Sequence, residues 1–541
     1  MLLVFASLLL AACHHGSGHA GDGNPTFSPG IIEADVNQHV RVLASTEFEG
    51  RAPGTRGEQL TTDYLIHQFQ RIGLAPGNNG SWLQAVPYVK ATLQRAAETK
   101  LVIDGSKGTS ALAFGSEMVV GSPANQPHAV ISHSPIVFVG YGVKVPEQQW
   151  DDYAGLDLKG KTVVMLVSEP GWSNQDPMLS KGRTLTWYSH KLEEAARQGA
   201  AAAFIVYDAE AVGYPWSVVQ SHWNGARLSL PASEDSRPRL PIAGWLTTVA
   251  AEKLFADAGA HFDALKKAAA ARGFKAVALD ATASIAIDNV VTQGESHNVI
   301  AKLAGSKRPY EAIVYSAHWD HLGREGSTIY PGAIDNASSV AGLLEIAEAF
   351  SHRRPRPERT IMFMALTMEE SGLLGSRYYV NHPLVPFDLT VAEINMDALT
   401  VIGPSRDISV IGYGQSQLDD YLAEAAAKQR RTLTPEHVPN KGFFARSAQF
   451  NFAKAGVPVL YARSGLDLRD GGVAAGGKAY DDYLANRYDR PTDVFDPHWN
   501  LTGMVQDLRL LYMVGGRLSR ETSFPQWKQG SDFRRPGVEA K

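Results

Sequence analysis

The chain of 541 residues contains a single cysteine, Cys13, so no internal disulfide can form. Its stability must come from hydrophobic cores and bound metals instead. The sequence also lacks any block of basic residues, and its formal net charge is only -5. Because phosphate binding needs a concentrated basic surface, we expect no nucleic-acid partner. After the first dozen residues, no apolar run is long enough to span a bilayer.

The one long apolar run covers residues 1–12 and ends at Cys13. Small residues directly before that cysteine are typical of a lipobox, where a bacterial signal peptide is cut and the new N-terminal cysteine is lipidated. A plain signal peptide that happens to hold a cysteine is the alternative. We therefore expect an exported chain, with a lipoprotein signal peptide over 1–13 and a flexible tether rich in Gly, His and Ser over 14–27.

The lipid would be the only membrane attachment of such a chain. His14 follows the cysteine, where an inner-membrane retention signal would place an aspartate. The sequence therefore predicts a lipid anchor in the bacterial cell envelope, in the outer membrane and facing the periplasm.

A chain of this length, with 44% hydrophobic residues, should fold into two or three domains rather than around one core. Three regions follow the tether. Residues 28–128 show helix-like periodicity around a turn-rich loop at 49–54, and residues 129–285 read as strand, helix, strand, which indicates a small α/β module. Residues 286–541 alternate strands and helices, and this alternation predicts a doubly wound, mostly parallel sheet.

Polar side chains follow three predicted strands of the last region, at 312–317, 361–366 and 394–396. The first strand runs into His318, Trp319, Asp320 and His321, the second into Glu369 and Glu370, and the third into Asp397. Asp335 and Asn336 stand between the first two strands, just ahead of an amphipathic helix. In open α/β sheets functional groups cluster beyond the carboxyl ends of the strands, so we expect these side chains to meet.

These residues have the chemistry of a zinc site. Catalytic zinc binds imidazole and carboxylate groups and leaves a position for water. One imidazole and three carboxylates come from four chain segments: His318, Asp335, Glu370 and Asp397. Glu369 remains free as general base toward a metal-activated water, and Asp320 could accept the other ring N–H of His318. Each signal is weak by itself, and their combination at strand ends is much more specific.

The sequence resembles the co-catalytic zinc aminopeptidases related to bacterial leucyl aminopeptidase and glutamate carboxypeptidase. The matching segments are 317–323, 332–338, 369–376 and 395–397, together with 49–55 near the start. The middle region is similar to the protease-associated domain often inserted in this family, through 138–142, 151–153, 160–161 and 193–196. The resemblance implies a three-layer α/β/α zinc exopeptidase domain with a mostly parallel sheet, formed by 28–128 and 286–541 and interrupted by a smaller insert at 129–285.

The resemblance also implies roles for individual residues. Asp335 would bridge two zinc ions, His318 and Asp397 would complete one site, and Glu370 would help hold the other. Glu369 would be the general base, and Asp320 would support His318. The insert would only shield the cleft or restrict access to it.

Two positions depart from the family pattern. Asp489 stands where the family has a histidine ligand, and Ala448 stands where an aspartate is usual. We expect Asp489 to be the fifth ligand, while the nearby His498 or an incomplete second site are the alternatives. A second site so rich in oxygen should also accept manganese or cobalt.

The predicted function is therefore removal of N-terminal residues from peptides by a metal-activated water. A catalytically inactive binding protein on the same fold is one alternative, and a one-zinc acyltransferase resembling glutaminyl cyclase is another. The sequence leaves open the side-chain specificity, a preference for carboxyl ends, and the oligomeric state.

Overall fold

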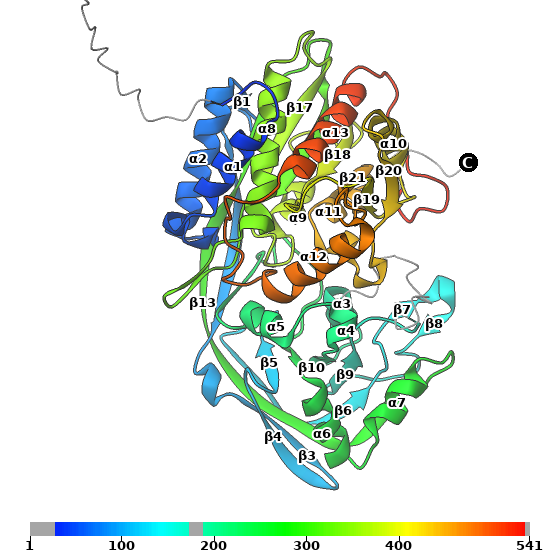
Figure 1. Ribbon diagram of the computed structural model, residues 1–541. Helices are drawn as coiled ribbons and strands as arrows, with labels where there is room; N and C mark the ends of the chain where they lie inside the picture. Colours follow the sequence, from blue (N-terminus) through cyan, green and yellow to red (C-terminus); the bar gives the residue numbers. More distant parts are fainter. Residues whose placement is uncertain (1–26, 172–187, 536–541) are drawn as a thin grey trace, which may run out of the picture.

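One strand, β13 (Val277–Leu303), runs along the molecule and takes part in both of its large sheets. The computed structural model describes residues 27–171 and 188–535. Figure 1 shows two α/β bodies joined along this strand. The predicted signal peptide, most of the tether and the lipidation site Cys13 lie outside the described residues.

Each body has its own apolar core. The large body comprises residues 27–94 and 289–535, and the small body comprises residues 95–171 and 188–288. At the junction Asp288 still pairs with His128 of the small body, whereas Asn289 pairs with Leu93 of the large body.

The sheet of the large body has a parallel centre and antiparallel edges. Its four central strands lie in the order β17 (Arg359–Leu366), β14 (Arg308–His318), β18 (Thr390–Asn395) and β21 (Val459–Ser464). On one side β13 and β2 (Leu83–Leu93) add antiparallel strands; on the other side β19 (Asp407–Ile411) is antiparallel, and β20 (Thr432–Pro435) pairs in parallel with β19. The α/β class expected from the sequence is confirmed, and the parallel arrangement holds for the centre of the sheet.

Helices cover both faces of this sheet. Along β14, Ile313 and Tyr315 pack on one face and Ala312 and Val314 on the other, as the two-residue period of a strand requires. The first face is covered by α1 (Glu33–Leu43), α2 (Arg56–Ile72), α8 (Ser339–Ser351), α10 (Leu418–Lys428) and α13 (Thr502–Leu518), the second by α9 (Leu374–Asn381) and α11 (Gln449–Lys454). The three-layer α/β/α arrangement is therefore present (Figure 1).

The small body contains a second mixed sheet. Its order is β4 (Gly108–Ala113), β3 (Lys100–Gly105), β13, β6 (His128–Phe138), β9 (Thr162–Leu166), β10 (Ala202–Val206), β12 (Ile242–Leu246) and β5 (Met118–Gly121). Helices α3 (Tyr188–Arg197), α4 (Ala209–Val212), α5 (Trp216–Trp223), α6 (Thr248–Asp257) and α7 (Phe262–Ala269) belong to this body. The short strand β11 (Ala226–Ser229) leaves it and pairs with β2 of the large body.

The structure begins the small body earlier than the sequence indicates. The sequence assigns residues 28–128 to the peptidase domain. β3, β4 and β5 lie in this range, yet they pack in the same core as Phe138 and Val164 of the small body. An alternating hairpin can join the edge of either sheet, so its pattern alone does not assign it. The expected boundary at residue 285 falls inside β13, because that strand continues from one sheet into the next.

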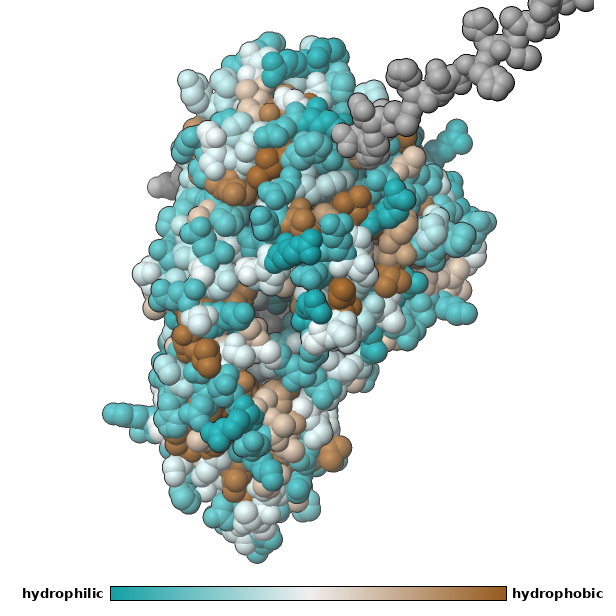
Figure 2. All heavy atoms as spheres, turned by 90° about the vertical axis from the view of Figure 1, so that its left-hand side faces the viewer, coloured by the Kyte–Doolittle hydropathy of each residue, from teal (hydrophilic) through white to brown (hydrophobic). Residues whose placement is uncertain are grey.

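Among the helices that the structure describes, none combines the length and the apolar character needed to span a bilayer. On the face shown in Figure 2, apolar residues are scattered among hydrophilic ones rather than gathered in one patch. Scattered apolar residues of this kind are normal on a protein surface.

Candidate metal centre

The carboxyl ends of three parallel strands bring the predicted residues together. His318 ends β14 beside Leu366 of β17, and Ser316 of β14 pairs with Asn395 of β18. Glu369 and Glu370 follow β17 after a short turn, and Asp397 follows β18. The strand register therefore places all four side chains at one edge of the sheet.

Asp335 reaches the same edge from the turn before α8. Gly332 has a φ of +55°, and a Cβ there would lie 2.1 Å from the carbonyl oxygen of Asp335, so only glycine fits. The carboxylate of Asp493 accepts hydrogen bonds from the backbone N–H groups of Ile334 and Asp335 at 3.0 to 3.2 Å. Asp493 thus holds the turn in place from beneath.

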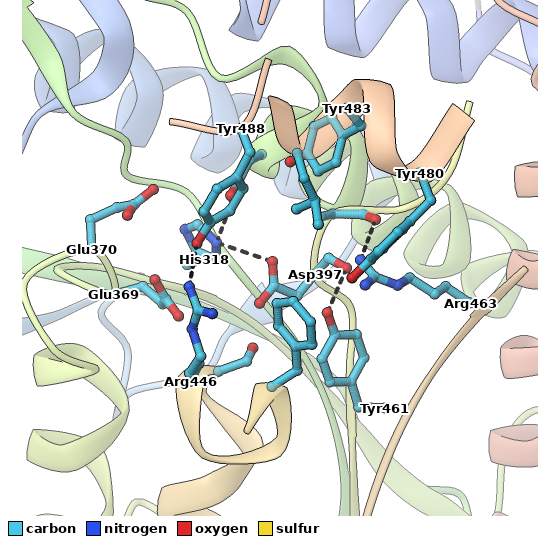
Figure 3. A pocket seen from close by; sticks show the side chains of 15 residues that line it. His318, Glu369, Glu370, Asp397, Arg446, Tyr461, Arg463, Tyr480, Tyr483 and Tyr488 are labelled. Atoms are coloured by element: carbon cyan, nitrogen blue, oxygen red, sulfur yellow. Dashed lines mark hydrogen bonds and ion pairs between the residues drawn. The ribbon is translucent and has the colours of Figure 1, made fainter. Parts of the chain in front are cut away.

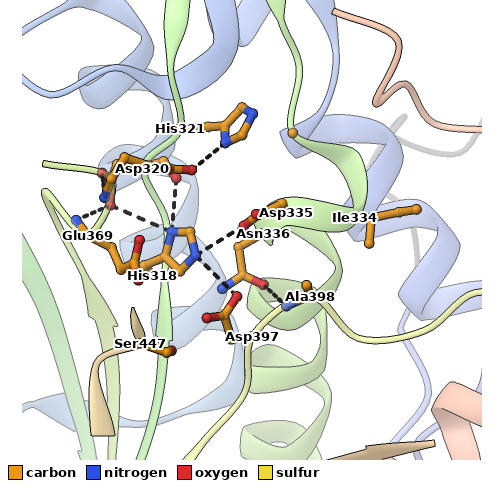
Figure 4. A network of polar contacts seen from close by, with 12 residues as sticks. His318, Asp320, His321, Ile334, Asp335, Asn336, Glu369, Asp397, Ala398 and Ser447 are labelled. Atoms are coloured by element: carbon orange, nitrogen blue, oxygen red, sulfur yellow. Dashed lines mark hydrogen bonds and ion pairs between the residues drawn. The ribbon is translucent and has the colours of Figure 1, made fainter. Parts of the chain in front are cut away.

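The ligand atoms of His318, Asp335 and Asp397 are spaced as they would be around one metal ion. Nε2 of His318 lies 3.2 Å from Oδ1 of Asp335 and 3.5 Å from Oδ1 of Asp397 (Figure 4). Two donors bound to one zinc at about 2.0–2.2 Å in a tetrahedral arrangement are about 3.3 Å apart. Oδ1 of Asp335 is buried and accepts no hydrogen bond from the residues that the structure describes. A divalent cation would satisfy that oxygen, so the residues present fit the metal that the resemblance implies.

A second group of possible ligands lies around Glu370. Ligand atoms of Glu370, Asp489 and His222 lie within 4.8 Å of one another. Asp489 is 2% exposed, whereas the alternative candidate His498 is exposed and belongs to none of the candidate groups among the described residues. The structure thus brings Asp489 to the site.

Two histidines beside Glu370, one inside this second group and one next to it, have no role in the sequence prediction. His222 belongs to α5 of the small body, and nothing in its own segment marks it as a ligand. Nδ1 of His321 lies 2.7 Å from Oε1 of Glu370. A metal-ligating carboxylate is ionised and only accepts hydrogen bonds, so His321 would donate to it and fix its orientation. The position of His321 three residues after His318 could have indicated that it lies at the same site.

Asp320 holds the turn that carries Glu369 and Glu370. Its carboxylate accepts hydrogen bonds from the backbone N–H groups of these two residues at 3.0 and 3.3 Å. Nδ1 of His318 lies 3.1 Å from the carbonyl oxygen of Asp320 and 3.8 Å from its carboxylate. The main chain of Asp320, rather than its side chain, is therefore the nearer acceptor for the ring N–H of His318 (Figure 4).

The site concentrates negative charge away from water. Burial raises the pKa of Glu369 well above its usual range, and nearby Asp397 and Glu370 raise it further. Burial likewise raises the pKa of Glu370, together with Asp489 and Asp335. Burial opposes the charged form of His318, but the surrounding carboxylates outweigh it and raise its pKa. Carboxylates crowded in this way favour a bound cation.

One buried arginine connects the loops beneath the site. Arg51, which is 1% exposed, donates hydrogen bonds to the carbonyl oxygens of Leu43, Trp319, Pro331 and Gly332 at 2.6 to 2.9 Å. It thereby ties the turn-rich loop at 49–54 to the segments before Asp320 and before Asp335.

The candidate ligands open into a cavity of about 500 Å³. Figure 3 shows Tyr488 and Arg446 on the side of Glu369, and Tyr461, Tyr480 and Arg463 on the side of Asp397. The sequence prediction missed this aromatic wall, which comes largely from α12 (Gly472–Asn486) and the residues after it.

A second cavity of about 750 Å³ adjoins the first and shares Phe443, Arg463 and Tyr480 with it. Its other lining residues are mostly apolar and include Val401, Ile411, Val438 and Leu466. Ala448, the second departure from the family pattern, lines neither cavity; it is buried in the apolar layer under the sheet.

A three-layer α/β/α fold with buried imidazole and carboxylate groups at its strand ends defines a metal-dependent hydrolase. The family model for peptidase family M28 matches residues 298–513, so the domain that carries the site is a member of that family. The resemblance to co-catalytic zinc aminopeptidases is thereby confirmed.

Known relatives match part of the chain. The vacuolar membrane protease of Lodderomyces elongisporus is 30% identical over 136 residues, 25% of this chain and 14% of that protein. The vacuolar membrane protease of Saccharomyces cerevisiae is 40% identical over 107 residues, 20% of this chain and 10% of that protein. A probable zinc metalloprotease of Pyricularia oryzae is 42% identical over 86 residues, 15% of this chain and 16% of that protein. The match thus spans a small share of each relative's length.

A solved structure extends the likeness to both bodies. The aminopeptidase from Aneurinibacillus sp. strain AM-1 superposes with a TM-score of 0.55 and 18% sequence identity, over 91% of this chain and 95% of that chain. At this identity the likeness shows a shared fold.

Proposed function

We propose that this chain is an exported zinc-dependent exopeptidase that removes residues from the amino ends of peptides. The observation that carries the proposal is the position of Glu369, a carboxylate that lies in one candidate ligand group with His318 and Asp397 and lines the same cavity. Oδ1 of Asp335 lies 3.2 Å from Nε2 of His318 and can be the carboxylate ligand in its place, so Glu369 is left free to move a proton.

The proposed ligand sets combine residues of all three candidate groups. His318, Asp335 and Asp397 would hold one zinc ion, and Glu370 and Asp489 would hold the second together with Asp335. Bound zinc supplies Lewis acidity toward the scissile carbonyl and lowers the pKa of its water. Glu369 takes a proton from the attacking water and delivers it to the leaving amine. Asp320 and His321 keep the carboxylates of this turn in position.

The cavity supports an exopeptidase that takes in one terminal residue of its substrate. The aromatic side chains of Tyr461, Tyr480 and Tyr488 line the cavity beside the candidate ligands and would favour a terminal residue over the middle of a long chain. Carboxylates around His318 would attract the ammonium group of a peptide amino terminus. The adjoining apolar cavity would take a hydrophobic side chain of the substrate.

A second candidate activity is removal of residues from carboxyl ends. Arg446 and Arg463 both line the cavity, and guanidinium groups bind carboxylates well. The carbonyl oxygen of Ala398 accepts a hydrogen bond from Arg463, and the hydroxyl of Tyr488 accepts one from Arg446, so both guanidinium groups already have partners. The one-zinc acyltransferase is less favoured, since a second group of donors lies beside the first.

A cleavage profile tests the proposal. Peptides blocked by N-acetylation should resist the zinc-loaded protein, while C-amidated peptides should be shortened from their amino ends. The reverse pattern would favour the carboxypeptidase, and no cleavage of either with zinc bound would favour an inactive binding protein.

Glu369→Gln tests the general base. We expect this variant to bind zinc as the wild type does and to lose activity by about a hundredfold or more, the range for a lost acid–base group. Glu49→Gln, at a partly buried glutamate of the loop before Arg51, is the matched control. Near-normal turnover by Glu369→Gln with zinc bound would remove Glu369 from this role.

Export and lipid anchoring at Cys13 are supported by the sequence pattern alone. Mass spectrometry of native protein should find an N-terminal Cys13 that carries acyl chains, in detergent extracts of the cell envelope. Several acyl chains are needed for stable anchoring. An intact Met1, or an unmodified cysteine at the new terminus, would contradict the anchor.

A further inference from the structure

The second metal group depends on a residue from the small body. Without His222, the candidate group that it forms with Glu370 and Asp489 contains carboxylates only. Nε2 of His222 lies 3.0 Å from Oδ2 of Asp489. Donors that share one zinc at about 2.0–2.2 Å are about 3 Å apart when the angle between them is near 90°, and further apart in a tetrahedral site. The spacing therefore suits an ion held by both residues.

Strand pairing fixes the position of His222 relative to the large body. His222 lies near the end of α5, and β11 begins four residues later with Ala226. β11 pairs with Val89–Thr92 of β2, so the chain leaves α5 and joins the sheet of the large body at once. The pairing of β11 with β2 therefore fixes the position of His222 beside Asp489, and the contact does not depend on packing between the two bodies alone.

The same segment packs against the turn that carries Glu369. Leu230, just after β11, is fully buried with Met368 and Leu374 of the large body and Val86 of β2. Met368 directly precedes Glu369 in the chain. The stretch from α5 to Leu230 therefore supports the site at two points, through an imidazole and through apolar packing.

One carboxylate oxygen of Asp489 remains available to a metal ion in this arrangement. The residue is 2% exposed, and its Oδ1 is buried and accepts no hydrogen bond from the described residues. A buried, unpaired carboxylate oxygen costs free energy unless a cation or donor meets it. His222 is a neutral ligand that, with this oxygen and Glu370, would give a second ion a mixed set of nitrogen and oxygen donors.

We propose that His222 of the small body is a ligand of the second metal ion, so that this ion binds both bodies at once. This inference rests on the proposed two-ion site. The small body then has a direct part in the metal centre, in place of the shielding role expected from the sequence. Loss of the second ion would also remove a contact between the bodies.

The test uses zinc binding by the full-length protein. Calorimetric titration of metal-free wild type should show two zinc ions bound. His222→Ala should keep the ion at His318 and weaken the second by at least about tenfold, the lower bound for loss of a group that only orients a ligand. His261→Ala, an exposed histidine that precedes α7 in the same body, should leave both ions unchanged.

A rescue variant separates ligation from general damage. His222→Ala combined with Asp489→His places an imidazole on the other side of the same pair and should restore the second ion. Asp489 has a φ of +54°, a conformation that histidine also tolerates. X-ray absorption of the zinc-loaded wild type should show about one imidazole per zinc, falling to about one half in His222→Ala under saturating zinc.

Three results would overturn the proposal: two ions with unchanged affinity in His222→Ala, an unchanged imidazole count, or no recovery in the double variant. These readouts do not depend on peptide cleavage. A protein that binds its second ion through His222 but cleaves no peptide would refute the proposed function and leave the ligand assignment standing.

Discussion

Replacing Arg51 with methionine should destabilise the large body without adding or removing a metal ligand. The four hydrogen bonds of Arg51 to carbonyl oxygens are lost together, and a methionine fills similar space but donates nothing. At about 1 kcal/mol net for each bond, the loss amounts to about 4 kcal/mol. This value is a lower bound, because burial lowers the pKa of Arg51 only to about 10, the guanidinium stays charged at neutral pH, and hydrogen bonds from a charged donor contribute more.

The expected change is measurable as a melting temperature. A body of roughly 300 residues unfolds with about 0.6 kcal/mol/K of entropy, so the loss should lower Tm by about 6 °C. Differential scanning calorimetry on zinc-loaded and chelator-treated protein provides the measurement. The decrease in Tm should be larger without metal. In the metal-free protein no bound cation offsets the charge of the nearby carboxylates of Asp493, Asp320 and Asp335, so the positive charge of Arg51 contributes more.

A neighbouring arginine provides the control. Arg324 pairs with Glu49 at 3.2 Å on the surface, and its side chain is half exposed. Arg324→Met should therefore change stability by less than about 1 kcal/mol. If Arg51→Met melted within 2 °C of Arg324→Met, roughly a third of the worked shift, the four hydrogen bonds would not stabilise the site as argued.

Further predictions concern the metals and one buried acid. Asp335→Ala should lose both zinc ions while Asp397→Ala keeps the second, and two full ions in the Asp335 variant by metal analysis would contradict the bridging role. Chelation should lower Tm, with about 4 kcal/mol lost for each ion held at a thousand times its Kd, and an unchanged Tm would exclude a stabilising metal. Burial raises the pKa of Glu345 from 4.5 to about 8 beside the buried His39, so the folded state holds its proton more tightly. Stability from Glu345 is thus lost as pH rises from 4.5 toward 8, and the Tm of Glu345→Gln should exceed that of wild type increasingly over this range; a constant difference would refute the shift.

The metal-site residues could be predicted because local pattern and fold class agree on them. His318, Glu370 and Asp397 each follow a buried strand, and parallel strands bring their carboxyl ends to one edge. Asp335 was recognisable from its place before a helix. These features lie within a few residues of each ligand, so a single sequence contains them.

His222 could not be predicted in this way. Its position depends on β11 crossing to β2, a pairing between segments more than a hundred residues apart in the chain. Long-range pairing is set by packing that a local pattern does not record. The polar stretch around Gly294 likewise concealed the full length of β13, since it does not alternate as a half-buried strand should.

The continuity of β13 has a consequence for engineering this protein. Asn289–Val299 pair residue by residue with Leu83–Leu93, and the same strand continues into the sheet of the small body. Cutting out residues 95–288 and closing the gap would need a new turn between β2 and β13, and would also delete β11 from the outer edge of β2. That edge would be left with unpaired backbone groups, which promote association between chains. A minimal version of the enzyme must therefore keep β11 or cover the edge of β2 by another means.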